Sequence, residues 1–323
     1  MLKLVAFLIS LWLLLTIVIY AFPMYMYNLE FALYKNTKNH LEESHDIIII
    51  GDSRAQAGLI PDTIGEDVYS YAVPGGTPIE GYYVLKEYLE NNGAPEKIII
   101  SFAPYHFERS DTFWERAIKY DFLNFKQGFE IVKTSVRLKD DFTLRGNNEK
   151  NLFIKQYGKL FLYKLKSPNY YLSDVSSGVK DAKTNYSTNA TVGRMVEQSK
   201  GQYYFGRAEF SDKKNSEASR DSFSKSLVLE YYLELLFSLC EEYEVTTYYF
   251  APPMNQVSAD ALDEDFVSGY RMLLDDMQHK HNGVEIDSSL YAMPNEYFGD
   301  ESHLNENGAK VFSEDIRKKI GED

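Results

Sequence analysis

Hydrophobic and polar residues follow two periodic patterns along most of this chain, and together these patterns predict a parallel sheet covered by helices. Runs of adjacent apolar, β-branched residues, such as residues 47–50, are typical of strands that are buried on both faces. Apolar residues spaced three or four apart, as in residues 224–243, are typical of amphipathic helices. The two kinds of segment alternate, which is the βαβ pattern of an α/β fold.

The predicted elements follow from this alternation. The strand-like runs are 47–50, 68–73, 97–102, 246–250 and 284–286, and the helical runs are 80–91, 224–243, 258–279 and 307–319. Residues 46–323 are therefore expected to form one domain, because strands and helices alternate both at the beginning and at the end of this part of the chain.

The middle of the chain, residues 111–223, does not show this alternation of strands and helices. It is rich in Lys, Asn, Ser and Tyr, and its apolar periodicity is poor. Helices are expected at 122–138 and 151–165, and residues 166–220 are expected to be irregular loops with short elements. We interpret this region as an insertion or lid, because such long loops in a compact protein are usually functional or disordered.

The amino terminus carries a long apolar run. Lys3 precedes residues 4–22, which hold no charge and approach the roughly 20 residues that span a bilayer. We predict a signal anchor over residues 1–27 and a polar juxtamembrane connector over 28–45, with the main domain exported. A cleaved signal peptide is the alternative, but the run exceeds an h-region of about 7–15 residues and no clear Ala-x-Ala site follows.

Composition narrows the class of protein. The chain has 323 residues, 44% of them hydrophobic, and a net charge of −14, so it can bury a core and lacks the basic excess typical of nucleic-acid binding. Its one cysteine, Cys240, is expected to be a buried thiol in a helix. His279 and His281 form a His-x-His pair without an evident third ligand, so neither a metal site nor a cofactor is predicted.

Three residues far apart in the sequence suggest a nucleophilic site. Ser53 follows the first predicted strand, and open α/β sheets place their ligand sites at the carboxyl ends of strands. Asp300 and His303 are close enough in sequence for the carboxylate to hold the imidazole. A serine hydroxyl needs a base, and that base needs an orienting group. Taken singly, Ser53 is equally typical of a helix cap and His303 of a protein surface.

The motifs around these residues resemble the SGNH/GDSL hydrolase superfamily. They are Gly51-Asp52-Ser53, the glycine pair Gly75-Gly76 after a strand, and the Asp300-x-x-His303 spacing. The resemblance covers about residues 46–110 and 224–320 and excludes the insert. It implies a flavodoxin-like three-layer α/β/α sandwich with a parallel sheet.

The resemblance also implies a role for each residue. Ser53 would be the nucleophile, His303 the general base and Asp300 the group that orients the base. The amides of Ser53 and of Gly75 or Gly76 would receive the oxyanion.

One part of the family pattern is missing. After the third strand the family reads Gly-x-Asn-Asp, whereas residues 102–106 read Phe-Ala-Pro-Tyr-His. Losing one oxyanion donor costs about 3–4 kcal/mol of barrier. Arg54, Tyr105 and His106 are the candidate replacements, and Asn255 is a candidate substrate contact at a later strand end. The alternatives are a salt bridge for Arg54, aromatic packing for His106 and a simple strand end for Asn255.

A narrower resemblance points to one branch of the family. The apolar amino terminus, the Gly-Asp-Ser-Arg start and the Pro-Pro-Met-Asn segment at 252–255 resemble the export-side proteins of teichoic-acid D-alanylation and alginate O-acetylation. Those proteins work beside a membrane-bound O-acyltransferase. The expected protein is a single-pass bacterial membrane protein whose extracytoplasmic domain is a serine esterase or O-acyltransferase for cell-surface polysaccharide or teichoic acid. The sequence does not choose between hydrolysis and transfer.

Two rival interpretations stay open at this point. A catalytically degenerate SGNH domain would bind a glycan or dock an acyltransferase, and the missing asparagine favours it. A secreted, lipase-like enzyme would lose its first residues by signal cleavage. Aromatic clusters at Tyr170-Tyr171 and Tyr203-Tyr204-Phe205 are candidate polymer contacts in the insert, although core packing is the commoner role of such residues.

Overall fold

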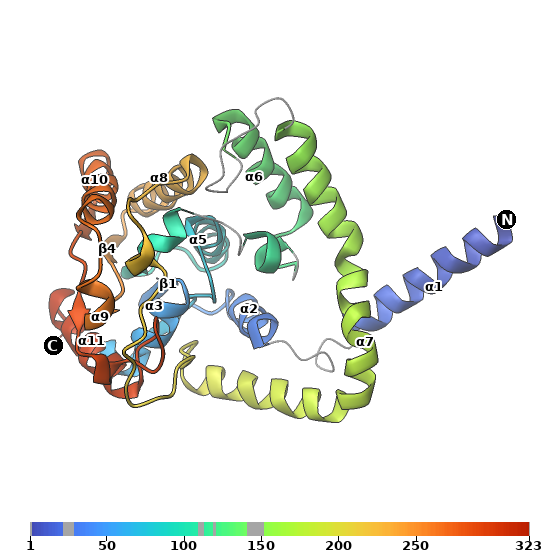
Figure 1. The fold of residues 1–323 in the computed structure, drawn as a ribbon, viewed down its shortest axis with the longest axis horizontal. Coiled ribbons are helices and arrows are strands. Elements are labelled where there is room, and N and C mark those ends of the chain that lie inside the picture. The colour runs from blue at the N-terminus through green and yellow to red at the C-terminus, as the bar shows by residue number, and fades with distance from the viewer. Residues whose placement is uncertain (1, 22–28, 109–112, 119–120, 141–151, 323) are drawn as a thin grey trace.

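The fold is built on a five-stranded parallel sheet (Figure 1). It comes from a computed structural model, which describes residues 2–21, 29–108, 113–118, 121–140 and 152–322. The strands, in spatial order, are β2 (Val68–Ser70), β1 (Ile47–Gly51), β3 (Lys97–Ser101), β4 (Thr246–Phe250) and β6 (Val284–Asp287). All neighbours pair in parallel, and this order is consistent with a flavodoxin-like sandwich. The predicted α/β class is confirmed.

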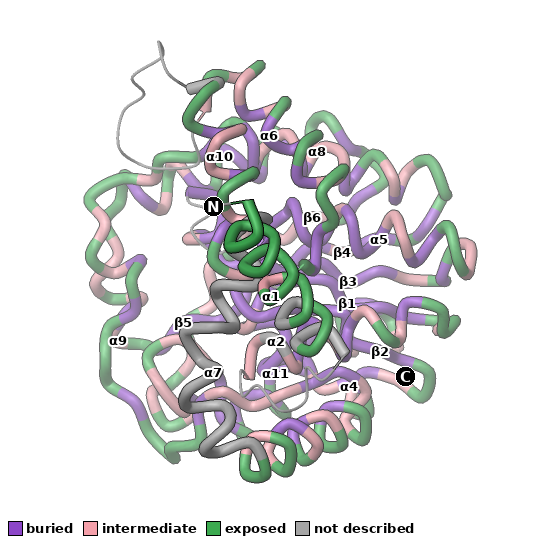
Figure 2. Tube along the Cα trace, turned by 90° about the vertical axis from the view of Figure 1, so that its right-hand side faces the viewer, coloured by how far each residue is buried: buried purple, intermediate pink, exposed green. Residues whose placement is uncertain are grey.

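Helices cover both faces of the sheet, which explains why its strands are apolar throughout. In β1, Ile48 and Ile50 contribute to one hydrophobic core and Ile47 and Ile49 to the other. The first face is covered by α5 (Pro78–Asn92), α8 (Leu227–Glu242) and α10 (Glu264–Lys280), and the second by α3 (Ser53–Gly58), α4 (Pro61–Ile64) and α11 (Glu306–Lys319). Figure 2 shows the strands buried between these helices.

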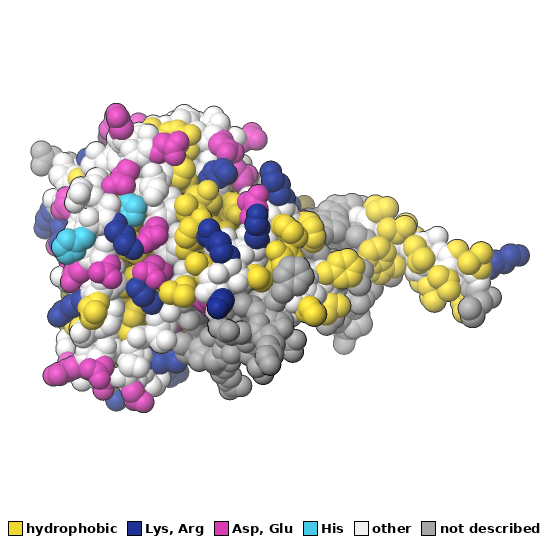
Figure 3. Space-filling view, turned by 90° about the horizontal axis from the view of Figure 1, so that it is seen from above, with side chains coloured by type: hydrophobic (Ala, Val, Ile, Leu, Met, Phe, Trp, Pro, Cys, Tyr) yellow, Lys and Arg dark blue, Asp and Glu magenta, His cyan; other side chains and the backbone are white. Residues whose placement is uncertain are grey.

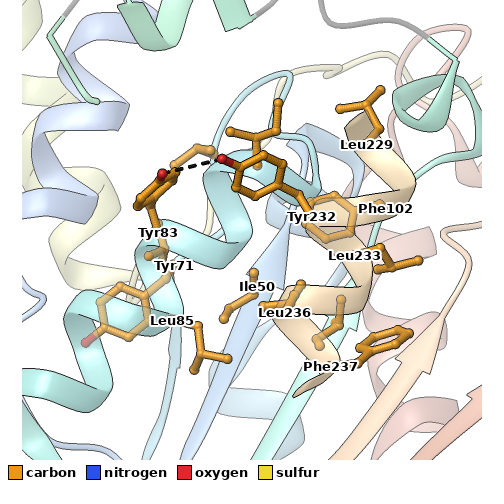
Figure 4. Close-up of a cluster of buried hydrophobic side chains, with 14 of the residues drawn as sticks. Ile50, Tyr71, Tyr83, Leu85, Phe102, Leu229, Tyr232, Leu233, Leu236 and Phe237 are labelled. Carbon is orange, nitrogen blue, oxygen red and sulfur yellow. Dashed lines mark hydrogen bonds between the residues drawn. The ribbon is translucent and has the colours of Figure 1, made fainter. Parts of the chain in front are cut away.

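The larger core lies between α5, α8 and the sheet (Figure 4). Gly81 of α5 allows close packing there, because a Cβ at this position would lie 2.8 Å from the Phe102 ring. The hydroxyl groups of Tyr83 and Tyr232 meet at 3.5 Å inside this apolar layer. Cys240 is buried in α8, as expected, and burial raises the pKa of its thiol to about 12.

Most predicted elements of the sheet and its covering helices have ends within three residues of those observed, and two differ in a way that changes the element. The strand expected at 68–73 ends at Ser70. The helix expected at 258–279 is two helices, α9 (Gln256–Ala259) and α10, because Asp263 caps a new amino terminus by accepting a hydrogen bond from Asp265 N. A short parallel pair, β5 (Met254–Asn255) and β7 (Ala292–Met293), lies outside the main sheet.

The prediction of irregular loops over the insert is wrong for residues 166–198. After α6 (Phe125–Leu138), residues Leu152–Gln198 form helix α7, which bends sharply near its middle so that its two arms frame the right side and the bottom of the view in Figure 1. Apolar contacts hold it near both ends: Leu160 packs on Gly128, and Val192 and Val196 pack on Leu33 of α2 (Leu29–Asn39). Local periodicity does not reveal contacts of this kind, because the partners are distant in the sequence.

The amino-terminal helix α1 (Leu2–Ala21) projects from the body of the molecule, and apolar side chains cover its visible surface in Figure 3. Its side chains at 15, 16 and 19–21 lie outside the described set. Within that set, no helix combines the length and hydropathy of a membrane span. The signal anchor stays a prediction. The connector at 28–45, expected to be simply polar, contains the partly buried helix α2.

The end of the insert is attached to the core beside the edge strand β2 and helix α3. Ser70 N donates to Lys200 O at 2.9 Å and Tyr203 N donates to Gln56 O at 3.2 Å. Gly201 has φ of +88°, and a Cβ there would lie 2.0 Å from Ser70 O. The segment after α7 therefore covers the open edge of β2 and reaches the start of α3.

Candidate active site

Ser53 is the first residue of α3, directly after β1. Asp52 caps this helix, because its Oδ1 accepts hydrogen bonds from Arg54 N at 2.8 Å and Ala55 N at 3.2 Å. The cap is thus Asp52 and not Ser53. The Ser53 amide donates to no acceptor in the described part of the chain, as expected for the first turn of a helix, and it remains available for an oxyanion.

Asp52 also joins the ends of β1 and β3. Its Oδ2 accepts a hydrogen bond from Ala103 N at 2.8 Å, and its own amide donates to Ser101 O at 3.3 Å. Gly51 is required for this approach, since a Cβ there would lie 2.1 Å from Ser101 O. β1 and β3 flank the point where the strand order reverses, which is where doubly wound sheets bind ligands.

The structure brings Ser53, His303 and Asp300 together in one hydrogen-bonded chain. His303 Nε2 lies 2.9 Å from Ser53 Oγ. On the other side of the ring, His303 Nδ1 lies 2.8 Å from Asp300 Oδ2 and 3.0 Å from Asp300 Oδ1. This arrangement of nucleophile, base and orienting carboxylate is the one that activates a serine.

A tight loop holds the base and its carboxylate. Asp300 Oδ1 accepts the amides of Ser302 at 2.8 Å and His303 at 2.7 Å, and an antiparallel bridge between Phe298 and Leu304 closes the loop. Burial alone would raise the pKa of Asp300, but the hydrogen bond and charge of His303 outweigh it and hold this pKa below its ordinary value. The ionised carboxylate favours a proton on Nδ1 and leaves Nε2 as the acceptor.

The end of the insert supports this loop through a contact that the sequence did not predict. A Cβ on Gly299 would lie 2.2 Å from Gly206 C, and one on Gly206 would lie 2.5 Å from Gly299 C. Ala208 N donates to Gly299 O at 3.3 Å. The Phe205 ring packs on the His303 ring with centroids 4.9 Å apart. The insert therefore positions the base.

Substituting Gly206 by alanine is expected to displace the loop and to slow hydrolysis of an aryl ester by about 10²-fold, since a shift of about 1 Å has that effect on a catalytic group. The matched control is Gly193→Ala in α7, where a Cβ meets nothing within 4 Å. This control should keep the wild-type rate and raise the free energy of unfolding by about 0.5–1 kcal/mol. Rates and urea titrations check both, and a folded Gly206→Ala protein with the wild-type rate would refute the positioning role.

Of the two glycine amides predicted to receive an oxyanion, one is already used. Gly76 N donates to Val73 O at 2.9 Å within the turn after β2. Gly75 has φ of +63° in the same turn, and its amide donates to no acceptor among the described residues. Val73 N donates to Gly51 O at 3.1 Å, which holds this turn against the end of β1. Gly75 is therefore the available donor.

Arg54, next to the nucleophile, forms a buried ion pair. Its Nη2 lies 2.8 Å from Oε2 of Glu217 in the short helix Glu217–Ser219, and the two side chains are 8% and 0% exposed. Burial would lower the pKa of Arg54, but Glu217, Asp52 and Asp300 outweigh it and raise this pKa. Arg54 Nη1 is buried and has no hydrogen-bond partner in the described chain, so one charged donor beside Ser53 is unused.

Tyr105 and His106 occupy the place of the missing asparagine, and His106 lies against Asp52. They belong to the short helix Pro104–Phe107. His106 Nε2 is 3.5 Å from Asp52 Oδ2, and burial lowers the pKa of His106 despite that carboxylate, so the imidazole is neutral. The Tyr105 ring packs edge-on against His106 at 5.5 Å and faces the Arg220 guanidinium at 5.8 Å. No described hydrogen bond joins His106 to Ser53.

Asn255 belongs to the scaffold. It is fully buried and caps α9, where its Oδ1 accepts Ser258 N at 3.1 Å. Its Nδ2 donates to Ser211 O at 3.2 Å and to Lys213 O at 2.8 Å. These bonds use both groups of the amide, so Asn255 fixes the end of the insert and offers no free donor to a substrate.

Three residues that complete the site were not predicted from the sequence, namely Glu217, Gly206 and Gly299, and Phe205 was predicted as a polymer contact but not as a neighbour of His303. Only Gly299 carried a local signal, because a glycine directly before Asp300 is a common sign of close backbone approach. The others lie in the region predicted to be loops. The side chains of Tyr170 and Tyr171, predicted as polymer contacts, lie outside the described residues.

Comparison with known proteins does not place the chain in a family. No protein-family model matches it, and a search of curated proteins finds no match. Among the described residues, no group of three or more His, Cys, Asp or Glu side chains is placed to hold a metal ion. The function is therefore argued from the geometry of the site.

Proposed function

We propose that the protein is a membrane-anchored, extracytoplasmic serine esterase or O-acyltransferase of the SGNH type, acting on acyl groups of a cell-surface polysaccharide or teichoic acid. The observation that carries the proposal is the hydrogen-bonded chain from Ser53 Oγ to His303 Nε2, at 2.9 Å, and from His303 Nδ1 to Asp300, at 2.8 Å. The position of Ser53 at the carboxyl end of β1 supports it.

The first half-reaction follows from this geometry. Ser53 Oγ attacks the ester carbonyl while His303 Nε2 takes its proton, and ionised Asp300 stabilises the imidazolium. The oxyanion receives the Ser53 and Gly75 amides, and the buried positive charge of Arg54, the residue after Ser53, stabilises it electrostatically in place of the missing asparagine. The tetrahedral intermediate collapses, His303 protonates the leaving alcohol, and the acyl group stays on Ser53.

The second half-reaction decides between the two activities. His303 removes a proton from the acceptor, and the acceptor oxygen attacks the acyl-enzyme. Water gives an esterase and a glycan hydroxyl gives a transferase, depending on how well the bound polymer excludes water. The His303 side chain keeps 18% of its surface exposed, so an acceptor reaches the base from outside.

The test supplies p-nitrophenyl acetate as the acyl donor and purified cell-wall polymer as the acceptor. Mass spectrometry then separates free acetate from acetylated polymer. We expect product that depends on Ser53 and is unaffected by Ser268→Ala, a control serine on the exposed face of α10. Acetylated polymer would establish transfer and acetate alone would establish hydrolysis. A folded protein that releases no p-nitrophenol would contradict the proposal.

A non-catalytic role is the second candidate. The absence of the family asparagine and the use of the Gly76 amide within its own turn favour a degenerate domain that binds glycan or docks a membrane-bound O-acyltransferase. Failure of Ser53 to react with a serine-directed probe would support it. The secreted-enzyme alternative is tested separately, by whether the mature protein retains residues 1–22.

A further inference from the structure

A second concave site lies beside the triad. A groove of about 640 Å³ opens between the end of α7, the segment that follows it, and the start of α11. This volume falls within the range of small-molecule sites, about 300–1,000 Å³. Its lining includes Gln198, Tyr203, Tyr204, Arg207, Glu209 and Asn307.

A row of aromatic rings connects the groove to the base. Tyr203 lines the groove, and its ring meets the Phe205 ring with centroids 5.1 Å apart. Phe205 in turn packs on His303 at 4.9 Å. Two ring contacts therefore separate the groove from the triad. An extended molecule lying along this row would reach Ser53, whose hydroxyl is bonded to the same histidine.

The polar groups in the groove suit hydroxyl groups. The side chains of Gln198, Arg207 and Asn307 are exposed and form no hydrogen bond or ion pair with other described residues. An amide offers a hydroxyl group both a donor and an acceptor in one plane, and a guanidinium group offers a planar set of donors. Tyrosine rings add apolar faces with a polar edge. Free amides beside aromatic faces form a surface that matches the polar edges and apolar faces of sugar rings.

The charge of the groove selects among glycans. Arg207 is the one cation of the lining, and Glu209 and Glu306 are two anions. The chain as a whole carries a net charge of −14. A polymer with a phosphate or carboxylate in each repeat would be repelled from such a surface, whereas an uncharged polymer would not.

We propose that this groove binds a neutral, polyhydroxylated glycan and presents its acylated unit to Ser53. The inference rests on the proposed function and narrows it, because it selects an uncharged polysaccharide over a polyanion such as teichoic acid. Tyr203 and Arg207 bind the glycan, and Phe205 guides it toward the base.

Isothermal titration of the full chain carrying Ser53→Ala tests the groove without turnover. The probes are oligosaccharides of glucose, mannose and N-acetylglucosamine, with poly(glycerol phosphate) as the anionic comparison. We expect a neutral oligosaccharide to bind and poly(glycerol phosphate) not to bind. Adding Tyr203→Ala or Arg207→Ala should weaken binding by about tenfold. Adding Tyr243→Ala, at the far end of α8 and outside the groove, should leave it unchanged.

A charge reversal sharpens the test. Replacing both Glu209 and Glu306 with lysine should create measurable binding to poly(glycerol phosphate). Tighter binding of the polyanion than of every neutral glycan by the unreversed protein would overturn the proposal, and so would the absence of any neutral binding. Failure of the groove and failure of the catalytic proposal are separable, because reaction of Ser53 with a fluorophosphonate is measured without any glycan.

Discussion

Replacing His303 with alanine is expected to lower kcat/KM for p-nitrophenyl acetate by about 10⁴- to 10⁶-fold while the protein remains folded. In the proposed mechanism His303 is the general base, and within the described structure its Nε2 lies 2.9 Å from Ser53 Oγ. Without it the hydroxyl keeps its proton and is a weak nucleophile. Steady-state kinetics beside circular dichroism measure both parts of this expectation.

The control for this substitution is His279→Ala, because His279 is exposed on α10, which packs on the opposite face of the sheet from α3 and α11. It should keep the wild-type rate.

Asp300→Asn should lower kcat/KM by about 10⁴-fold, since an amide favours the wrong tautomer of the base. The pKa of Asp300 lies below its ordinary value, so the carboxylate is ionised and holds His303 at neutral pH. This interaction is lost only as the pH falls through that pKa. A wild-type rate in His303→Ala would exclude this mechanism.

Removing Glu217 should produce the largest loss of stability from a single charge. Glu217→Ala leaves the Arg54 guanidinium buried without its partner, because the side chains are 0% and 8% exposed. Breaking one side of such a pair costs about 3–5 kcal/mol. Urea titration measures the free energy of unfolding. An exposed pair provides the matched control: Glu234→Ala breaks the contact with Lys280 and should cost no more than about 1 kcal/mol.

A double substitution separates the structural role of this pair from its role in catalysis. Arg54→Met with Glu217→Leu removes both charges, so most of the stability lost in Glu217→Ala should return. The rate of ester hydrolysis should stay low, because the positive charge beside the nucleophile is gone. Stability of Glu217→Ala within about 1 kcal/mol of wild type would show that Arg54 is not held as described.

The sheet and the triad were predictable because their signals are local. Residues 47–50 are four isoleucines, and such a run suits only a strand covered on both faces. The Asp300-x-x-His303 spacing is itself local, and the loop that it predicts is the one observed. Contact with Ser53 then follows from topology, because the carboxyl ends of parallel strands lie at one edge of the sheet.

The insert was not predictable in the same way. Among its described residues, α7 buries apolar side chains near its two ends, where Leu160 meets Gly128 and Val196 meets Leu33, and its sequence shows little periodicity. The pair of Arg54 with Glu217 joins residues from two regions that no local pattern connects. Phe205 and His303, whose rings are in contact, are likewise far apart in the sequence. These contacts position the side chains around Ser53 and His303, and only the tertiary structure reveals them.

The most direct test of the triad is the intact mass of the full chain after treatment with a fluorophosphonate probe. We expect one adduct on the wild type and on Ser268→Ala, and none on Ser53→Ala or His303→Ala. A folded wild-type protein that acquires no adduct, or a Ser53→Ala protein that is labelled as fast as the wild type, would contradict the claim that Ser53 is an activated nucleophile.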